Sequence, residues 1–192
     1  MSAQLAPPRM SLEEFLDWSD GQEGKFELDD GLVIAMAPER IGHSRAKFAI
    51  ARALVDAVAK AGVPCEAFVE GPGVRIDAAT SYQPDALVQC GQPLEASVRM
   101  IDTPVIVVEI LSPSTAYRDL GRKARNYFRV PSIAHYLIVD LDDRVVIHHR
   151  RQDGGAIVTK PHVAGDLVLD PPGISIAVEA MLPPAEIGPS TG

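Results

Sequence analysis

The alternation of apolar and polar positions predicts three helices along the chain. In the longest, alanine, isoleucine, leucine and valine recur every three or four residues, and Gly62 and Pro64 follow as stop signals. The shortest begins with Ser11 and Glu14, which have the spacing of a capping box. The predicted helices span residues 11–19, about 39–61, and a third segment from a cap at Ser114 or Thr115 to about Arg129.

Short apolar runs separated by turn residues predict the strands. The first two flank Asp29, Asp30 and Gly31 and indicate a hairpin, whereas the last four predict a meander. The runs lie at 25–28, 32–36, 66–71, 73–76, 83–89, 104–111, 135–140, 144–151, 156–160 and 166–170. Together with the helices, they indicate an α+β or mixed α/β domain with one central sheet.

The length of 192 residues suits one domain. The first residues lack the cationic start and apolar stretch of a secretory signal, and no uncharged apolar run is long enough to span a bilayer. We therefore expect a soluble cytoplasmic protein. The expected organisation is a flexible tail at 1–9, a single domain at 10–182 and a flexible tail at 183–192.

The charge pattern limits the ways in which nucleic acid can be bound. Eighteen basic and 26 acidic residues give a formal charge of −8, so no broad basic surface is expected. A polyanion would have to be met locally by the basic residues of 118–129 or 144–151. Taken by itself, each of these runs is better explained as a solvated face.

One predicted strand carries a carboxylate in an otherwise apolar run. Glu109 follows four apolar β-formers, and Ile110 and Leu111 continue the run on both faces. A short run without alternation is typical of a strand covered on both sides, so we expect Glu109 to be buried. A buried carboxylate is costly unless a cation, a metal ion or several donors offset its charge. The sequence must therefore supply a partner.

Two partners for Glu109 are available. Pro84 opens an earlier strand run, which puts Asp85 at a strand end, and two carboxylates on neighbouring strands suit a hard divalent cation such as Mg²⁺. The other candidate is Lys123, whose helix follows the strand closely enough for the side chain to point back over it. On spacing alone, a modest surface ion pair between Lys123 and Asp119 is the favoured interpretation.

An ordered set of motifs resembles a known family. The motifs are Pro84-Asp85, VVEILSPST at 107–115, Asp119, Lys123, Tyr127 and HYLIVD at 135–140, preceded by FELDDG, LVIAMAP and His43. Spread over about residues 10–180, this set resembles the Uma-type family of restriction endonucleases, a branch of the PD-(D/E)XK nuclease superfamily. The resemblance implies a restriction-endonuclease-like fold, with a central mixed sheet flanked by helices and followed here by the C-terminal β meander.

The resemblance also implies the residues of the motif. Asp85 and Glu109 match its two acidic positions. Its lysine should lie two residues after the glutamate, where this chain has Leu111. Lys123 looks like that lysine moved onto the helix, so activity requires Lys123 to reach the same point in space.

Glu27 and His43 are implied near the site by the resemblance alone. From the residues themselves, Glu27 alternates with Phe26 and Leu28 and is equally an exposed strand carboxylate. His43 lies on the apolar stripe of its helix and is equally a core histidine with satisfied hydrogen bonds. Both alternatives stay open at this point.

The cysteines and the other histidines do not suggest a metal site. Cys65 and Cys90 lack CxxC spacing, and we interpret them as buried small apolar residues, not as a zinc site or a disulfide framework. Two of the histidines are adjacent, so in a strand they point to opposite faces, and two are isolated in the sequence. We interpret all four as ordinary surface or strand residues: His135, His148, His149 and His162.

The function implied by the resemblance is metal-dependent hydrolysis of DNA phosphodiester bonds, with homodimerisation as a further expectation. The expected ligands of one Mg²⁺ or Mn²⁺ are Asp85, Glu109 and the backbone carbonyl of Ile110. Lys123 would orient or help deprotonate the attacking water, and Glu27 and His43 would complete the surroundings or a weaker second metal site.

Two other functions remain open. Leu111 and the negative net charge favour a nuclease-like scaffold that no longer cuts and serves as a binding or assembly module. Hydrolysis of a small phosphoester would use the same residues as cleavage of DNA.

Overall fold

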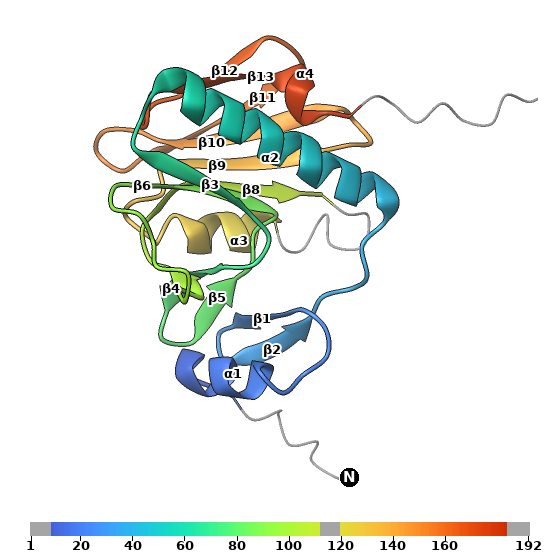
Figure 1. Cartoon of the computed structure of the whole chain (residues 1–192), viewed down its shortest axis with the longest axis vertical. Coiled ribbons are helices and arrows are strands. Elements are labelled where there is room, and N and C mark those ends of the chain that lie inside the picture. The colour runs from blue at the N-terminus through green and yellow to red at the C-terminus, as the bar shows by residue number, and fades with distance from the viewer. Residues whose placement is uncertain (1–8, 112–119, 184–192) are drawn as a thin grey trace, which may run out of the picture.

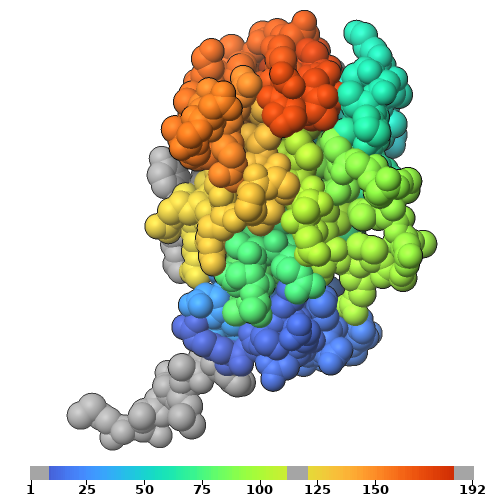
Figure 2. Space-filling view, turned by 90° about the vertical axis from the view of Figure 1, so that its left-hand side faces the viewer, coloured from blue at the N-terminus to red at the C-terminus, as the bar shows by residue number. Residues whose placement is uncertain are grey.

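The computed structural model describes residues 9–111 and 120–183. Within these ranges the strands form three sheets, and the largest has elements packed on both of its faces (Figure 1). The N-terminal layer lies at one end of the molecule and the C-terminal hairpin at the other (Figure 2). The mixed α/β class predicted from the sequence is therefore confirmed.

The largest sheet holds the central strand that carries Glu109. Its strand order is β11-β10-β9-β8-β6-β3, and β8 runs parallel to β9 while the other neighbours are antiparallel. The strands are β3 (Cys65–Val69), β6 (Ala86–Cys90), β8 (Pro104–Ile110), β9 (His135–Asp140), β10 (Val145–Arg151) and β11 (Ile157–His162). Helix α3 (Leu120–Tyr127) lies between β8 and β9 in the sequence, in the crossover that a parallel pair requires.

One face of this sheet is covered by α2 and the C-terminal elements (Figure 1). The elements are α2 (Ile41–Ala61), β12 (Asp166–Leu169), β13 (Ile174–Ala177) and α4 (Val178–Met181). Ala46, Ile50 and Leu54 of α2 are fully buried and belong to one apolar cluster with residues of β6 and β8. This packing explains the helical spacing of apolar residues and fixes the direction of the first turns of α2.

The other face packs against α3 and a second sheet of five strands, in the order β2-β1-β5-β4-β7. Its strands are β1 (Phe26–Asp29), β2 (Leu32–Ala35), β4 (Gly73–Asp77), β5 (Thr80–Tyr82) and β7 (Met100–Ile101). Helix α1 (Leu12–Ser19) packs through Leu12 and Phe15 onto Leu28 of β1. The predicted capping box is present, because Ser11 and Glu14 exchange hydrogen bonds.

Several short elements differ from the sequence prediction. Instead of one central sheet, the described residues form two larger sheets, and the run at 166–170 leaves the meander to pair as β12 with β13. Strands of two to four residues, such as β5, β7 and β13, are too short to display a period. Helix α3 ends at Tyr127 instead of about Arg129.

Some predictions lie outside the described residues. They include the caps at Ser114 or Thr115 and nearly all of the expected tails. Among the helices that the structure describes, none is both long and apolar enough to cross a membrane.

The interpretation of the two cysteines was wrong, because Cys65 and Cys90 form a disulfide. They are 25 residues apart in sequence but directly opposite in the antiparallel pair of β3 and β6. Facing residues of such a pair hold their Cβ atoms close enough for the two sulfur atoms to bond. Strand register, which no cysteine motif reveals, is therefore the reason for the error.

Candidate functional site

Asp85 and Glu109 lie side by side at one end of the central sheet. The antiparallel register pairs Ala86 of β6 with Val108 of β8, which carries Asp85 next to Glu109. The backbone N–H of Ile110 donates to Oδ2 of Asp85 over 2.7 Å, and Asp85 is only 6% exposed. The sheet backbone thus holds the carboxylate of Asp85 in place.

The first turns of α2 bring two cationic or polar side chains to Asp85. Nε2 of His43 lies 3.0 Å from Oδ1 of Asp85, and Nζ of Lys47 lies 2.9 Å from the same oxygen. Burial alone would raise the pKa of Asp85, but His43 and Lys47 outweigh it and lower that pKa. Asp85 is therefore held as a carboxylate.

Lys47 belongs to a wider ionic cluster. Its ammonium also forms ion pairs with Glu39, in the segment before α2, and with Glu70, just after β3. Burial would lower the pKa of Lys47, but the carboxylates Glu39, Glu70 and Asp85 together raise it above its ordinary value. Lys47 is therefore charged at neutral pH.

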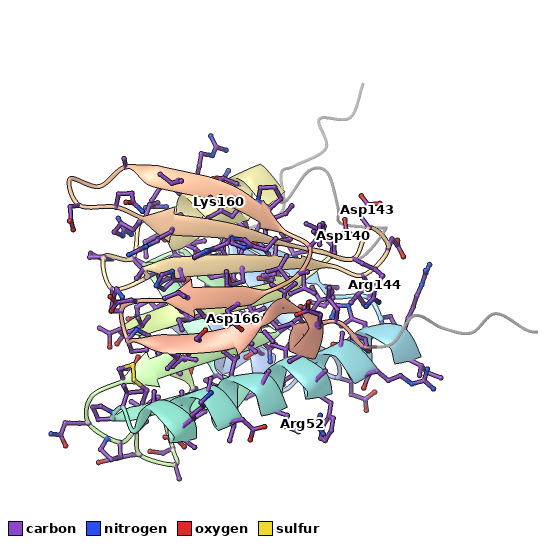
Figure 3. All side chains as sticks on the ribbon, turned by 90° about the horizontal axis from the view of Figure 1, so that it is seen from above. Arg52, Asp140, Asp143, Arg144, Lys160 and Asp166 are labelled. Atoms are coloured by element: carbon purple, nitrogen blue, oxygen red, sulfur yellow. A yellow bond between two sulfur atoms is a disulfide. The ribbon has the colours of Figure 1, made fainter. Side chains whose placement is uncertain are left out.

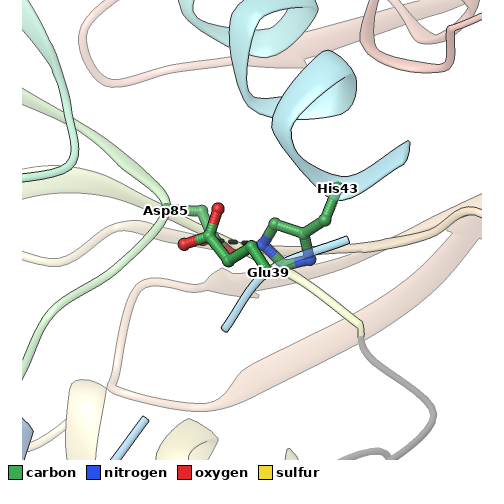
Figure 4. Close-up of side chains that lie close together, drawn as sticks. All are labelled: Glu39, His43 and Asp85. Atoms are coloured by element: carbon green, nitrogen blue, oxygen red, sulfur yellow. Dashed lines mark hydrogen bonds and ion pairs between the residues drawn. The ribbon is translucent and has the colours of Figure 1, made fainter. Parts of the chain in front are cut away.

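Glu39, His43 and Asp85 form a group with the composition of a metal site (Figure 4). One potential ligand atom from each residue lies within 4.8 Å of the others. Among the described residues, this is the group of histidine and acidic side chains that lies close enough together to hold a metal ion. Two carboxylates and an imidazole suit Mn²⁺ or another divalent transition ion, and the carboxylates also suit Mg²⁺. The donor set therefore fits a divalent cation.

Glu109 lies in a second ionic cluster, on the α3 side of the sheet. Its Oε1 accepts hydrogen bonds from Nζ of Lys123 over 3.0 Å and from the hydroxyl of Tyr127 over 2.7 Å. The pKa of Glu109 is raised to about 7, chiefly by burial and also by the charges of Glu27 and Asp85, against the lowering effect of Lys123. Glu109 thus titrates near neutral pH.

Glu27 belongs to the same cluster. Its Oε1 accepts from Nζ of Lys123 over 2.9 Å and from the backbone N–H of Gln83 over 3.0 Å. Lys123 therefore bridges Glu27 and Glu109. The open alternative of an exposed strand carboxylate does not hold for Glu27, because the residue is buried.

A set of polar contacts anchors α3 on the second sheet. The hydroxyl of Tyr82 donates to Oδ1 of Asp29 over 3.0 Å, and the side-chain amide of Asn126 donates to that hydroxyl over 2.6 Å. Arg122 adds an ion pair of 2.9 Å to the same Asp29 oxygen. These contacts hold the inner face of α3 in place, and Lys123 lies on that face with its Nζ 5.2 Å from the centre of the Tyr82 ring.

The structure brings all five sequence-derived side chains into two adjacent clusters. Asp85 lies with His43, and Glu109 with Lys123 and Glu27. Asp119, the alternative partner of Lys123, lies outside the described residues. The ligand set of Asp85, Glu109 and the Ile110 carbonyl stays a prediction.

Sequence reasoning missed Glu39, Lys47 and Glu70. A usable signal was the separation of four residues between His43 and Lys47, which puts both on one face of α2. Glu39 and Glu70 have no such signal, because only the fold brings the residues before α2 and after β3 together.

His135 and His162, which are isolated in the sequence, are neighbours of His148 in the fold. His135, His148 and His162 lie on one side of β9, β10 and β11, and Nδ1 of His135 lies 2.8 Å from Nε2 of His148. Burial lowers the pKa of His135 to about 4 and that of His148 to about 3. Both imidazoles are therefore neutral at pH 7.

Comparison with known proteins links this geometry to a family. The family model described as "Uma2: Putative restriction endonuclease" matches residues 12–183. Two uncharacterized proteins of Synechocystis sp. are similar in sequence: one is 30% identical over 91% of this chain and 92% of its own length, and the other 26% identical over 74% and 81%.

A solved structure has a similar fold. It is the crystal structure of a protein from Anabaena variabilis described as a "putative nuclease belonging to DUF820". The TM-score is 0.71 at 16% identity, over 90% of this chain and 97% of the other. At this identity the likeness shows the fold alone.

Proposed function

The chain belongs to the Uma2 family ("Putative restriction endonuclease"), and we propose that it is a divalent-metal-dependent endonuclease that hydrolyses phosphodiester bonds in DNA. The observation that carries this proposal is the pairing of Asp85 and Glu109 at the ends of neighbouring strands, each in contact with a charged lysine. A fold alone does not require two buried lysine–carboxylate clusters side by side, since each is costly to desolvate.

The metal would be held by Asp85 together with Glu39 and His43, whose ligand atoms are grouped closely enough for one ion. Asp85, Glu109 and the Ile110 carbonyl remain the alternative set implied by the sequence motif. When bound, Mg²⁺ or Mn²⁺ would lower the pKa of a water molecule and offset negative charge on the scissile phosphate.

The remaining residues of the site would orient water and stabilise charge. Lys123 would donate hydrogen bonds to the water or to the phosphate, which develops negative charge as the bond breaks. Glu109, with a pKa of about 7, is suited to accept a proton from that water near neutral pH. Glu27 would keep the Lys123 ammonium directed at the site over 2.9 Å.

Capture of DNA is expected to be weak and sensitive to salt, because the chain carries a net charge of −8. Two arginines near α3 are already paired, Arg122 with Asp29 and Arg129 with Asp77. Arg125 is exposed on α3 and is the best placed of these three arginines for a phosphate contact.

Homodimerisation, which would place two sites on one duplex, is part of this proposal and is measured by sedimentation.

The second candidate function is a nuclease-like scaffold that binds without cutting. Leu111 at the motif's lysine position favours it, as does the engagement of the Lys123 ammonium by two carboxylates, Glu27 and Glu109. A small phosphoester in place of DNA is distinguished by testing nucleotides beside DNA.

The test is incubation of supercoiled plasmid with the purified protein and Mg²⁺ or Mn²⁺. We expect nicked and linear products from the wild type, and a loss of at least about 100-fold in rate for Glu109→Ala and Lys123→Ala. Lys160→Ala, which changes an exposed lysine on β11, is the matched control. Equal cleavage by all four proteins would mean a contaminating nuclease and would contradict the proposal.

A thermal-shift measurement tests the metal separately from cleavage. Mn²⁺ should raise the Tm of the wild type, because a ligand that binds only the folded state stabilises it. The rise should vanish in Asp85→Ala. An unchanged wild-type Tm at millimolar Mn²⁺ would count against metal dependence.

A further inference from the structure

Lys47 lies inside the candidate metal centre. It stands in the second turn of α2, and its side chain is only 7% exposed. Its ammonium lies 2.9 Å from Oδ1 of Asp85 and 2.5 Å from Oε1 of Glu70, and it is paired with Glu39 as well. One positive charge thus contacts three negative charges within a single cluster.

The contacts of Lys47 overlap with those that a metal ion needs. Two of its three carboxylate partners, Glu39 and Asp85, are members of the candidate ligand group. The third member, His43, points its Nε2 at the same Asp85 oxygen that Lys47 contacts. The other Asp85 oxygen already accepts the backbone N–H of Ile110. Lys47 and a divalent ion therefore require the same oxygens, and their like charges repel at this range.

We propose that Lys47 is a built-in competitor of the divalent cation, which neutralises the cluster in the metal-free protein and gives up Glu39 and Asp85 when the ion binds. The proposal rests on the proposed metal dependence and assigns Lys47 a role that neither the motif nor the family description contains. Glu70 supplies the alternative partner, because it contacts Lys47 and lies outside the ligand group.

The charge of Lys47 would let the cluster fold before a metal ion binds. Three carboxylates brought together without a cation would repel one another, whereas the ammonium of Lys47 offsets their charge. The same ammonium must weaken metal binding, because the metal ion has to break the ion pairs of Lys47 with Glu39 and Asp85 before it can bind. Replacing Lys47 should therefore strengthen metal binding. If Lys47 had only a structural role, its replacement would loosen the site and weaken metal binding instead.

The test is titration of the full-length protein with Mn²⁺ by calorimetry. Lys47→Met should bind Mn²⁺ at least tenfold more tightly than the wild type, and Lys47→Gln should change in the same direction. Lys60→Met, which removes an exposed charge from the end of the same helix, should stay within twofold of the wild type. Circular dichroism verifies the fold of each variant, and Lys47→Gln keeps hydrogen-bonding capacity where methionine is not tolerated.

Equal or weaker Mn²⁺ binding by both Lys47 variants would overturn the inference. Plasmid cleavage distinguishes this failure from failure of the proposed function. If the wild type cuts DNA and the Lys47 variants bind Mn²⁺ no more tightly, the inference alone fails. If the variants bind Mn²⁺ more tightly and no protein cuts, the nuclease proposal alone fails.

Discussion

Lys123 allows two carboxylates from different sheets to lie inside the protein. Its ammonium contacts Oε1 of Glu27 and Oε1 of Glu109 at 2.9 and 3.0 Å. Each carboxylate alone would lose several kcal/mol of hydration on burial, and one shared cation with the Tyr127 hydroxyl offsets most of this cost. The raised pKa of Glu109, about 7, indicates that one ammonium does not fully compensate for both.

Replacing Lys123 with methionine should lower the free energy of unfolding by about 3 kcal/mol at pH 8, because both carboxylates lose their cation. The loss should be smaller at pH 5.5. The pKa of Glu109 is already about 7 with Lys123 present, above the ordinary 4.5, and loss of the ammonium raises it further. The folded variant therefore takes up a proton there as the pH falls, which removes the unpaired charge. Urea unfolding at both pH values measures the difference from the wild type.

The matched control for this prediction is Arg125→Met, which changes an exposed cation on the same helix. It should alter the free energy of unfolding by no more than about 0.5 kcal/mol at either pH. If Lys123→Met loses the same stability at pH 8 and pH 5.5, the charge of Glu109 is not the source of the effect.

At the scale of residues, the sequence predicted some side chains of the site and not others. The unbroken apolar run around Glu109 predicted a largely buried carboxylate, and the side chain is 14% exposed. Burial of Glu27 could not be predicted from local alternation, because α3, which supplies its partner, follows about 90 residues later in the chain. Lys47 flanks an apolar stripe, where lysine usually reaches solvent, so its burial was missed.

At the scale of elements, the disulfide ties β3, the edge strand of the main sheet, to β6. Cys65 and Cys90 lie at the ends of these strands away from Asp85, because Val69 and Ala86 form the pair nearest the site. The bond therefore stabilises the sheet at the far end without touching the ionic clusters. It links two strands whose pairing α2 also covers.

Reduction of this disulfide should lower the free energy of unfolding by about 3 kcal/mol, the size expected for release of a loop of this length. Mn²⁺ affinity should not change, because the bond lies at the opposite end of β3 and β6. Urea unfolding with and without a thiol reductant measures the loss. The double variant Cys65→Ala/Cys90→Ala is the control and should be insensitive to reductant. A loss of Mn²⁺ affinity on reduction would show that the far end of the sheet controls the site.

Long elements, and elements whose partners are close in the sequence, could be predicted more easily than short strands with distant partners. The 21 residues of α2 display several helical repeats, and the β1–β2 hairpin is marked by its turn residues. By contrast, β5 has three residues and depends on pairing with β1 and β4, which come from other parts of the chain. The same dependence on partner strands concealed the Cys65–Cys90 register.

At the scale of the whole molecule, charged residues of both signs lie on the face seen in Figure 3. Figure 3 labels Arg52 on α2, Lys160 on β11 and Asp166 on β12, with Asp140, Asp143 and Arg144 gathered at the β9–β10 turn. Mixed signs of this kind give little long-range attraction for a polyanion. Any DNA would therefore be recruited by local contacts near the site.

The interior of the molecule also holds two titratable groups, on β9 and β10, that do not belong to the candidate site. His135 and His148 are buried on the side of the main sheet that packs against the C-terminal hairpin. Their pKa values, about 4 and about 3, are lowered chiefly by burial, and for His148 also by the neighbouring imidazoles. Protonating either ring would place a charge inside the core.

The free energy of unfolding should therefore fall as the pH decreases below about 6.5. In the unfolded chain both imidazoles gain protons near their ordinary pKa of 6.5, whereas in the folded protein they stay neutral down to about pH 4. The unfolded state then binds more protons, and each imidazole costs about 1.4 kcal/mol per pH unit between these limits. Urea unfolding at pH 7, 6 and 5 measures the slope.

The double variant His135→Leu/His148→Leu removes both groups and should flatten the dependence of the free energy of unfolding on pH. The control Lys160→Gln, which changes the residue opposite His148 on β11, should follow the wild type. Parallel curves for the double variant and the wild type would place the acid sensitivity elsewhere, in carboxylates such as Asp85 whose folded pKa is lowered.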